Sequence, residues 1–387
     1  MKSPFAAAPV AALLLAVPLL ATGARAQLLV SANDGKAVLV NGVSTVPADP
    51  VPDHVTIVDL GQSPPKVVGE VPAPASVVGP PQSVAVAPDE SIALVTGATR
   101  IDPNNPKKVA PDDKLTVIDL KASPPKVLAT LEAGKGASGV SINRTGTLAL
   151  VANRAEGTVS VFSIKDKALT PAGKIDFGNA KSGPSHAVFT PDGKAALVTR
   201  DGDHKISLLS VDGDKVTYTK RDMVGGIRPY AIEVGPKGDV AIVGNQGGGQ
   251  GDADTINVID LAAKPPRIVD TISVGQTVEG VSISHDGAHV SLTVMNGSNR
   301  PKESPFFNDH GLVKVFAVSG TKLTPVTEAK VGHWCQGAAW SRDGRTLVVE
   351  CMVEQELMLF RFDGHSLTPA APIKLKAGPA GLRTAEP

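Results

Sequence analysis

The chain has few aromatic residues and no excess of charge of either sign. Its 387 residues include only two tyrosines and two tryptophans, and 38 Lys and Arg balance 38 Asp and Glu. A protein without a basic excess has no long-range electrostatic attraction for nucleic acid or for an anionic membrane surface. So few large rings also argue against a platform on which sugars or bases stack. We therefore predict no nucleic-acid partner.

Long apolar runs are absent except near the N-terminus. A lysine precedes an apolar run over residues 5–20, and Ala-Arg-Ala at 24–26 forms a small-x-small cleavage site. This pattern predicts a secretory signal peptide over residues 1–26. The alternative is a transmembrane anchor, which two prolines within the run argue against. We expect a monomer that is periplasmic or secreted, with no membrane span after cleavage.

Cysteine is also scarce, since Cys335 and Cys351 are the only two. Two thiols alone make a poor metal site, and in an oxidising compartment a pair favours a single disulfide. The two cysteines are nearly equidistant from the Asp343-Gly344 turn, so they face each other across the predicted hairpin. We predict a Cys335–Cys351 disulfide. The alternative, a redox pair, lacks the close CxxC spacing.

What the sequence does contain is a repeated unit. A turn residue recurs seven times, and a short apolar strand follows it each time. The turn positions are Gly35, Glu90, Gly146, Gly193, Gly238, Gly287 and Gly344. Four short strands per unit, without helical periodicity, predict an all-β seven-bladed β-propeller of four-stranded antiparallel blades, as a single domain over residues 27–387. A β-sandwich, the main alternative, does not predict one unit repeated in register.

Ring closure is predicted from the two ends of the mature chain. Blade one reads as complete from Leu28, with "AVLVNG" as its second strand, and blade seven ends near Leu375. Residues 377–384, "AGPAGLRT", are similar to the lead-in of a first strand such as "SGPSHAVFT". We predict that this tail lies beside blade one and helps to close the ring.

The repeat resembles that of a known family. The segments "TPDGKAALVTR" and "ALVANRAEGTVSVF" follow the pattern of YVTN-type repeat proteins and of lactonase-like seven-bladed propellers, over nearly the whole mature chain. The tyrosine of the YVTN repeat is absent, and Leu150 or Leu197 stands at such positions. The resemblance implies the fold, with each blade's first strand lining a central channel, and says little about activity.

The connections between second and third strands vary most in length, and in such a propeller they lie on one face. The long ones are residues 43–53, 98–113, 246–254 and 296–310. Long loops on one rim of a rigid scaffold usually carry function. The alternative is neutral insertion at tolerant hairpin tips. We predict that this face binds a small polar ligand or a protein partner.

Polar residues recur eight positions before each turn residue. They are Gln27, Gln82, Ser138, Ser185, Tyr230, Glu279 and Gln336. As a ring at the channel mouth they predict a site for a small polar ligand; alternatively they hold channel water. Arg154 and Trp334 are further candidates for ligand contact, although the type and position of Trp334 favour a capped core ring.

Acids and histidines on the same rim are scattered. No HxH or HExxH spacing occurs, and lysines and arginines lie among aspartates such as Asp53, Asp112 and Asp254. The segment "GGGQGDAD" resembles a calcium-binding glycine-rich repeat but occurs only once. We predict no metal site and no cofactor, and leave calcium open as a ligand of the acidic loops.

The lactonase-like resemblance implies a catalytic histidine in one blade's lead-in and an arginine in the next, followed by a glutamate and a second arginine. At these positions the chain has Ser138 or Gly139, Ser185, Asp201 and Gln246. His186 and Arg228 lie nearby in sequence, so His186, Asp201 and Arg228 are the candidate catalytic residues. Cationic groups there would polarise a lactone carbonyl. Two functions remain open: an exported binding or scaffold propeller, and a hydrolase or isomerase of a lactone-type substrate.

Overall fold

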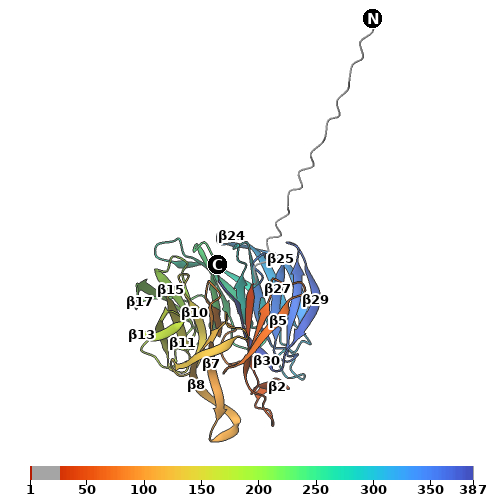
Figure 1. Cartoon of the computed structure of the whole chain (residues 1–387), viewed down its shortest axis with the longest axis horizontal. Helices are drawn as coiled ribbons and strands as arrows, with labels where there is room; N and C mark the ends of the chain where they lie inside the picture. The colour runs from red at the N-terminus through yellow and green to blue at the C-terminus, as the bar shows by residue number, and fades with distance from the viewer. Residues whose placement is uncertain (2–26, 387) are drawn as a thin grey trace.

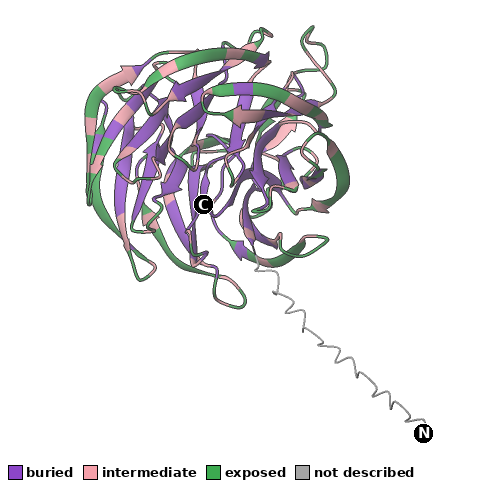
Figure 2. Cartoon of the chain, turned by 90° about the horizontal axis from the view of Figure 1, so that it is seen from above, coloured by how far each residue is buried: buried purple, intermediate pink, exposed green. Residues whose placement is uncertain are grey.

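The described part of the chain forms a closed ring of seven antiparallel β-sheets. The computed structural model describes Met1 and residues 27–386, so the rest of the predicted signal peptide lies outside the described residues. Seven four-stranded sheets surround a central axis, and a two-stranded sheet projects from the ring (Figures 1 and 2). The described residues contain no helix, and hence none with the length and hydropathy of a membrane span. The predicted seven-bladed propeller is confirmed.

Blades two to seven each use four consecutive strands. Blade two contains β6 (Val84–Val86), β7 (Ile92–Asp102), β8 (Asn105–Asp119) and β9 (Lys126–Glu132), and blade three contains β10 (Ala137–Ile142), β11 (Leu148–Asn153), β12 (Thr158–Lys165) and β13 (Ala168–Asp176). Blade four contains β14 (Pro184–Phe189), β15 (Ala195–Arg200), β16 (Lys205–Asp212) and β17 (Lys215–Met223), and blade five contains β18 (Pro229–Val234), β19 (Val240–Asn245), β20 (Asp254–Asp260) and β21 (Arg267–Gly275). Blade six contains β22 (Val278–Ile283), β23 (His289–Val294), β24 (Gly311–Ser319) and β25 (Lys322–Val331), and blade seven contains β26 (Cys335–Trp340), β27 (Thr346–Cys351), β28 (Glu356–Phe362) and β29 (Leu367–Lys374).

Burial falls from the axis to the rim of each blade. The innermost strands β10, β14, β22 and β26 are buried along their whole length, whereas the outermost strands β9 and β29 are mostly exposed. Apolar side chains of neighbouring blades pack together, as Leu197 and Ile206 of blade four do with Ile232 and Val243 of blade five. Because one blade cannot cover its own apolar faces, the ring has to close.

The turns that define the repeat join the first and second strands. Gly193 and Gly344 each adopt a φ of 68° there, a conformation that glycine takes at no steric cost. On the other face, β7 and β8 extend into a long hairpin and β2 (Val38–Val40) projects beside it (Figure 1). We call this second face, formed by the connections between second and third strands, the loop-rich face.

The C-terminal strand closes the ring in blade one. The order in this sheet is β30 (Gly378–Thr384), β1 (Leu28–Asp34), β4 (His54–Asp59) and β5 (Lys66–Pro72). Leu29 of β1 lies opposite Thr384 of β30. The predicted role of residues 377–384 is confirmed. The prediction that blade one is complete from Leu28 is wrong, because its innermost strand comes from the far end of the chain.

The repeat register predicted for blade one is also wrong. The segment "AVLVNG" forms β2, which pairs with β3 (Val43–Thr45) about an Asn41-Gly42 turn with positive φ at both residues. This Asn-Gly hairpin lies inside a loop and imitates the repeat. Blade one has no turn between its first and second strands, because the two ends of the chain lie there. Gln27 is therefore not at the mouth predicted for it; its Oε1 accepts a hydrogen bond from the Arg342 backbone at 2.6 Å, beside the tight turns.

Candidate functional site

Loops of blades five, six and one join into a continuous cover over part of the loop-rich face. The blade-six loop, residues 296–310, reaches the β2–β3 hairpin, where the Lys302 N–H donates to Asn41 Oδ1 at 3.1 Å. The Arg300 guanidinium donates to the Gly249 carbonyl of the blade-five loop at 2.8 Å. The long loops therefore support one another across three blades.

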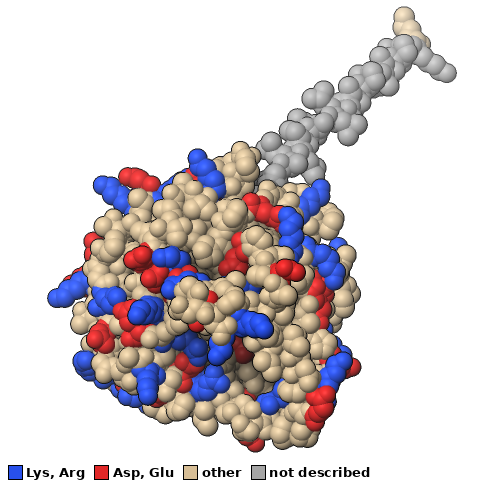
Figure 3. Space-filling view, turned by 90° about the horizontal axis from the view of Figure 1, so that it is seen from below, with Lys and Arg blue, Asp and Glu red and all other residues tan. Residues whose placement is uncertain are grey.

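A cleft of about 590 Å³ opens in the remaining part of this face. Its lining comes mainly from blades two to five, where blades three and four have short connections (residues 154–157 and 201–204) between their second and third strands. Lys and Arg gather around the hollowed middle of the face (Figure 3). A volume of this size is typical of small-molecule sites.

Irregular pairing in the innermost strands determines where the polar side chains of the channel mouth point. In β22 the pairing with β23 jumps from Val278 to Gly280, which leaves Glu279 without a partner on β23. The same irregularity leaves Ser138, Ser185, Tyr230 and Gln336 unpaired. Such a bulge takes a side chain out of the regular alternation of the strand and re-aims it. All five residues are buried.

Part of this polar ring connects neighbouring blades. Ser138 Oγ donates to the Ser185 carbonyl at 3.0 Å, and Gln336 Nε2 lies 3.4 Å from the Val77 carbonyl that accepts its hydrogen bond. Gln82 is buried, and its Oε1 has no hydrogen-bond partner among the described residues. These side chains are held between blades, and none of them lines the cleft.

Three residues singled out from the sequence meet in the lining of the cleft. Asp201, which follows β15, is buried, and Arg154 Nη2 donates a hydrogen bond to its Oδ2. Arg228 Nη2 lies 3.6 Å from the same oxygen. A side chain at Gly183 would prevent this arrangement, because a Cβ there would lie 2.3 Å from Asp201 Oδ1. Two guanidinium groups share one carboxylate, which leaves net positive charge at the cleft.

The cations of this cluster are open to the cleft while the carboxylate is covered. The side chains of Arg154 and Arg228 are 28% and 39% exposed, against 4% for Asp201. The Arg154 guanidinium also lies 5.8 Å from the centre of the Tyr230 ring, which connects the cleft to the polar ring. The backbone N–H of Arg228 donates to His204 Nδ1 at 3.2 Å. The arrangement can therefore stabilise a negative charge that develops on a bound ligand.

Glu279 is the buried carboxyl next to this cluster, and it lies behind the residues that line the cleft. Its Oε1 accepts a hydrogen bond from Gln246 Nε2 at 2.8 Å, whereas its Oε2 has no partner among the described residues. Burial raises the pKa of Glu279 to about 7, against the opposing charges of Arg228 and Arg154. A carboxyl with a pKa near neutrality and a free oxygen can accept a proton from a substrate or water.

His186, predicted as a catalytic candidate, lies apart from Asp201 and Arg228. Its ring is buried, and Nδ1 donates to the Ile232 carbonyl of blade five at 3.0 Å. Burial lowers the pKa of His186 to about 3, so the ring is neutral at physiological pH. His186 does not line the cleft and joins blade four to blade five instead.

Trp334 also lies outside the cleft. It is half-buried and packs against a small apolar cluster that includes Ala37, Val77 and Met352. Its backbone N–H donates to Ser298 Oγ at 3.3 Å. This is the packing role that the sequence left as the alternative to ligand contact.

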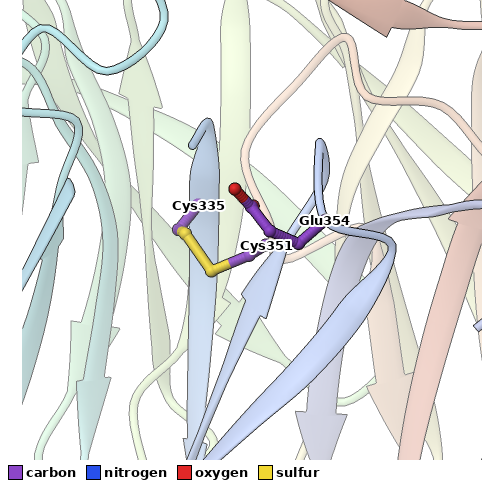
Figure 4. Close-up of side chains that lie close together, drawn as sticks. All are labelled: Cys335, Cys351 and Glu354. Atoms are coloured by element: carbon purple, nitrogen blue, oxygen red, sulfur yellow. A yellow bond between two sulfur atoms is a disulfide. The ribbon is translucent and has the colours of Figure 1, made fainter. Parts of the chain in front are cut away.

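The predicted disulfide is confirmed. Cys335 of β26 lies directly opposite Cys351 of β27, and the two are joined (Figure 4). Together with Glu354 they are the only group of three metal-ligating side chains brought together in residues 27–386. Both sulfurs belong to the disulfide and offer no thiolate, while Glu354 accepts a hydrogen bond from His333 Nδ1 at 2.7 Å.

The acidic residues of the loops are mostly engaged with cations. Asp53 pairs with Lys36 at 2.7 Å, and Asp112 pairs with Arg100 at 2.9 Å. These pairs hold the bases of the long loops.

Sequence reasoning missed two parts of the site. Gln246 was considered only as the place of an absent arginine, yet it holds Glu279. The repeat contains a signal for it, because Arg154, Asp201 and Gln246 each directly follow the second strand of their blade. The apolar side of the cleft, formed by Val78 and Val109, had no signal, because only the fold brings these segments together.

Comparison with known proteins identifies the family. A family model described as lactonase, 7-bladed beta-propeller, matches residues 140–374. The chain belongs to this lactonase family. A search of curated proteins found no match.

Solved structures share the fold of this lactonase-family chain at low identity. A putative 6-phosphogluconolactonase from Bacteroides fragilis is 16% identical, with a TM-score of 0.70 over 95% of this chain and 99% of that chain. The periplasmic gluconolactonase PpgL of Pseudomonas aeruginosa is 15% identical, with a TM-score of 0.68 over 93% and 99%. A functionally unknown protein from Desulfotomaculum acetoxidans has the same identity, TM-score and coverage. At such identities the likeness establishes the fold alone.

Proposed function

We propose that this protein hydrolyses the ring ester of a small lactone bound in the cleft. The observation that carries the proposal is the grouping of Arg154, Asp201 and Arg228 in the cleft beside Glu279, a buried carboxyl with a free oxygen. Lactone hydrolysis needs a site that stabilises an oxyanion and a base that takes a proton from water. Membership of the lactonase family supports the same reaction class.

Each residue has a separate role in the proposed reaction. Water attacks the lactone carbonyl and its proton passes through a second water to Glu279, which lies behind the cleft lining, while the carbonyl oxygen becomes an oxyanion facing Arg154 and Arg228. The ring C–O bond then breaks, and the proton on Glu279 passes to the departing ring oxygen. The product is one hydroxy acid, which contains all the atoms of one lactone and one water. Asp201 acts through the two arginines, as a positioning residue.

The pKa of Glu279 suits this role. A general base is most effective when its pKa is near the working pH, and burial raises that of Glu279 to about 7. His186 has no part in the scheme, because its ring nitrogen is used in a hydrogen bond between blades.

An Arg154→Ala variant tests the role of the guanidinium group. Removal of one oxyanion donor lowers kcat by about a hundredfold to a thousandfold in comparable sites. We expect that loss with a panel of γ- and δ-lactones followed by acid release, and partial recovery when free guanidinium ion is added. Arg267→Ala is the control, because Arg267 is exposed on the outermost strand β21.

Two outcomes would contradict the proposal. One is that the wild-type protein hydrolyses no lactone in the panel. The other is that Arg154→Ala hydrolyses lactones as fast as Arg267→Ala. Binding of hydroxy acids to wild type without any turnover would instead favour the binding-protein alternative, and would be measured as a rise in Tm.

A further inference from the structure

The cleft has two chemically different ends. Arg154, Lys181 and Arg228 contribute cations, and Asp201 is the one carboxylate among the lining residues. These charged side chains come from blades three to five. At the other end, blade two and the segment that leads into it contribute Val78, Ala98, Val109 and Pro111. The separation follows the ring, because the charged lining comes from blades three to five, whereas blade two contributes apolar residues and one hydroxyl, that of Thr99, which is hydrogen-bonded to Ser76.

The valines of the apolar end are open to the cleft. Val78 is 37% exposed and Val109 is 39% exposed, although each has apolar neighbours in the lining. Exposed apolar side chains that line a concave site are available to bury apolar ligand surface.

This apolar end is held in place by polar contacts behind it. The Val78 N–H donates to Ser76 Oγ at 3.0 Å, and the Ser76 and Thr99 hydroxyls are hydrogen-bonded at 2.8 Å. On the same hairpin, Arg100 donates to Asp112 Oδ1 at 2.9 Å and to the Pro111 carbonyl at 3.3 Å. Because the connection that carries Val78 and the hairpin that carries Val109 are fixed in this way, the apolar surface exists before a ligand binds.

We infer that the substrate is a lactone with an apolar alkyl or aryl substituent rather than a polyhydroxylated sugar lactone. This inference rests on the proposed function, and it assigns the lactone carbonyl to the cationic end and the substituent to Val78 and Val109. A valine surface offers hydroxyl groups no hydrogen-bond partner, so sugar hydroxyls would lose hydration there without replacement. A methylene chain, by contrast, gains from each carbon that leaves water.

A homologous series of γ-alkyl γ-butyrolactones, from the unsubstituted ring to the hexyl derivative, tests this assignment. We expect kcat/KM to rise by about fourfold per methylene until the chain fills the apolar end. Glucono-δ-lactone should be a poorer substrate than the longer alkyl lactones. A flat series, with glucono-δ-lactone as the best substrate, would overturn the inference and leave the proposed function intact.

The Val109→Thr variant tests whether the effect of alkyl chain length arises at the apolar end of the cleft. It replaces one methyl group by a hydroxyl of nearly the same size, so the cleft keeps its shape. We expect kcat/KM for the hexyl lactone to fall by about fivefold or more, because the hydroxyl loses its water when the chain binds. The fall for the unsubstituted lactone should be smaller, because this lactone has no chain that reaches Val109. Val127→Thr is the matched control, since Val127 is 37% exposed on the outermost strand β9, away from the cleft.

Binding separates failure of this inference from failure of the proposed function. If no lactone is hydrolysed, the proposed function fails, and non-hydrolysable alkyl lactams then serve as probes of the cleft. A larger rise in Tm with the hexyl lactam than with the unsubstituted lactam, reduced by Val109→Thr, would support an apolar-substituted ligand. Equal shifts for both lactams would overturn it.

Discussion

The two ends of the central channel each contain a buried glutamate near an arginine, but only at one end do the neighbouring arginines line a large cleft. At the end beside the tight turns, Glu233 accepts hydrogen bonds from Arg383 Nη1 at 2.6 Å and from the Ile283 N–H at 2.7 Å. The cavity next to Glu233 has about 50 Å³, enough for water but not for a substrate. At the loop-rich end, Glu279 has one hydrogen bond and a free oxygen, beside a cleft of about 590 Å³.

The difference shows that a shifted pKa does not by itself identify a functional carboxyl. Burial raises the pKa of Glu233 and of Glu279 alike, to about 7. What separates them is the use of their oxygen atoms and the size of the nearest cavity. Glu233 is satisfied by partners within the fold and joins β30 to blade five, whereas Glu279 has an oxygen that no described residue uses.

The largest expected difference between the two ends is in catalysis. Glu279→Gln should lower kcat by about a hundredfold to ten-thousandfold, the usual contribution of a general base, whereas Glu233→Gln should leave kcat unchanged. In the wild type, kcat/KM should rise with pH through about 7, because Glu279 has to lose its proton to act. Steady-state rates between pH 5 and 9 measure both effects. Equal losses of kcat in Glu279→Gln and Glu233→Gln would contradict the different roles given to the two glutamates.

The next expected difference is in stability. Here a variant at the end beside the tight turns should lose more than a variant at the loop-rich end. Arg383→Met leaves Glu233 buried without its cation, and breaking such a pair costs about 3–5 kcal/mol. Arg228→Met should cost less than about 1 kcal/mol, because the Arg228 side chain is 39% exposed and Asp201 keeps Arg154. Urea unfolding measures both. We expect Arg383→Met to keep its kcat/KM below its Tm and Arg228→Met to lose it; the reverse pattern would contradict the roles given to the two ends.

A third buried carboxyl sharpens the comparison, because it has neither a cation nor a cleft. Glu350 of β27 has no well-formed hydrogen bond at either oxygen, and its nearest donors are the backbone N–H groups of Gly337 and Gly381. Burial raises the pKa of Glu350 well above its ordinary value of 4.5. The stability that this group contributes is therefore present below pH 4.5 and is lost as the pH rises towards the pKa of the folded state.

Glu350→Gln should remove the loss of stability that accompanies a rise in pH. Relative to the wild type, the free energy of unfolding of the variant should gain about 1.4 kcal/mol per pH unit above 4.5, until the folded-state pKa is reached. Denaturant unfolding of both proteins at pH 5, 6, 7 and 8 measures the gap. A gap that stays constant with pH would show that Glu350 is not held in its protonated form.

The fold was largely predictable because its signals are local and repeated. Each turn glycine, such as Gly193, marks its own hairpin, and the position of Cys335 and Cys351 about one turn was enough to predict their disulfide. Blade one was predicted wrongly because its first strand comes from the opposite end of the chain. The Asn41-Gly42 hairpin inside a loop then supplied a false repeat.

The site was less predictable because its residues come together only through the ring. Arg154, Asp201 and Arg228 were each singled out from the sequence, but nothing in the sequence shows that both arginines reach one carboxylate. From its register, His186 was expected beside the polar ring or turned towards the neighbouring blade, and the sequence could not decide between the two. Irregular pairing at the neighbouring Ser185 re-aims the strand, and the imidazole is bound to the Ile232 carbonyl of blade five.

Closure of the ring depends on strand β30, because β30 is the innermost strand of blade one. A product that stops before Gly378 leaves β1 with a bare edge of unpaired N–H and C=O groups, and such an edge recruits strands from other chains. Synthesis must therefore continue through Thr384 before the ring can close, and any fusion after this strand has to leave Gly378–Thr384 free to insert.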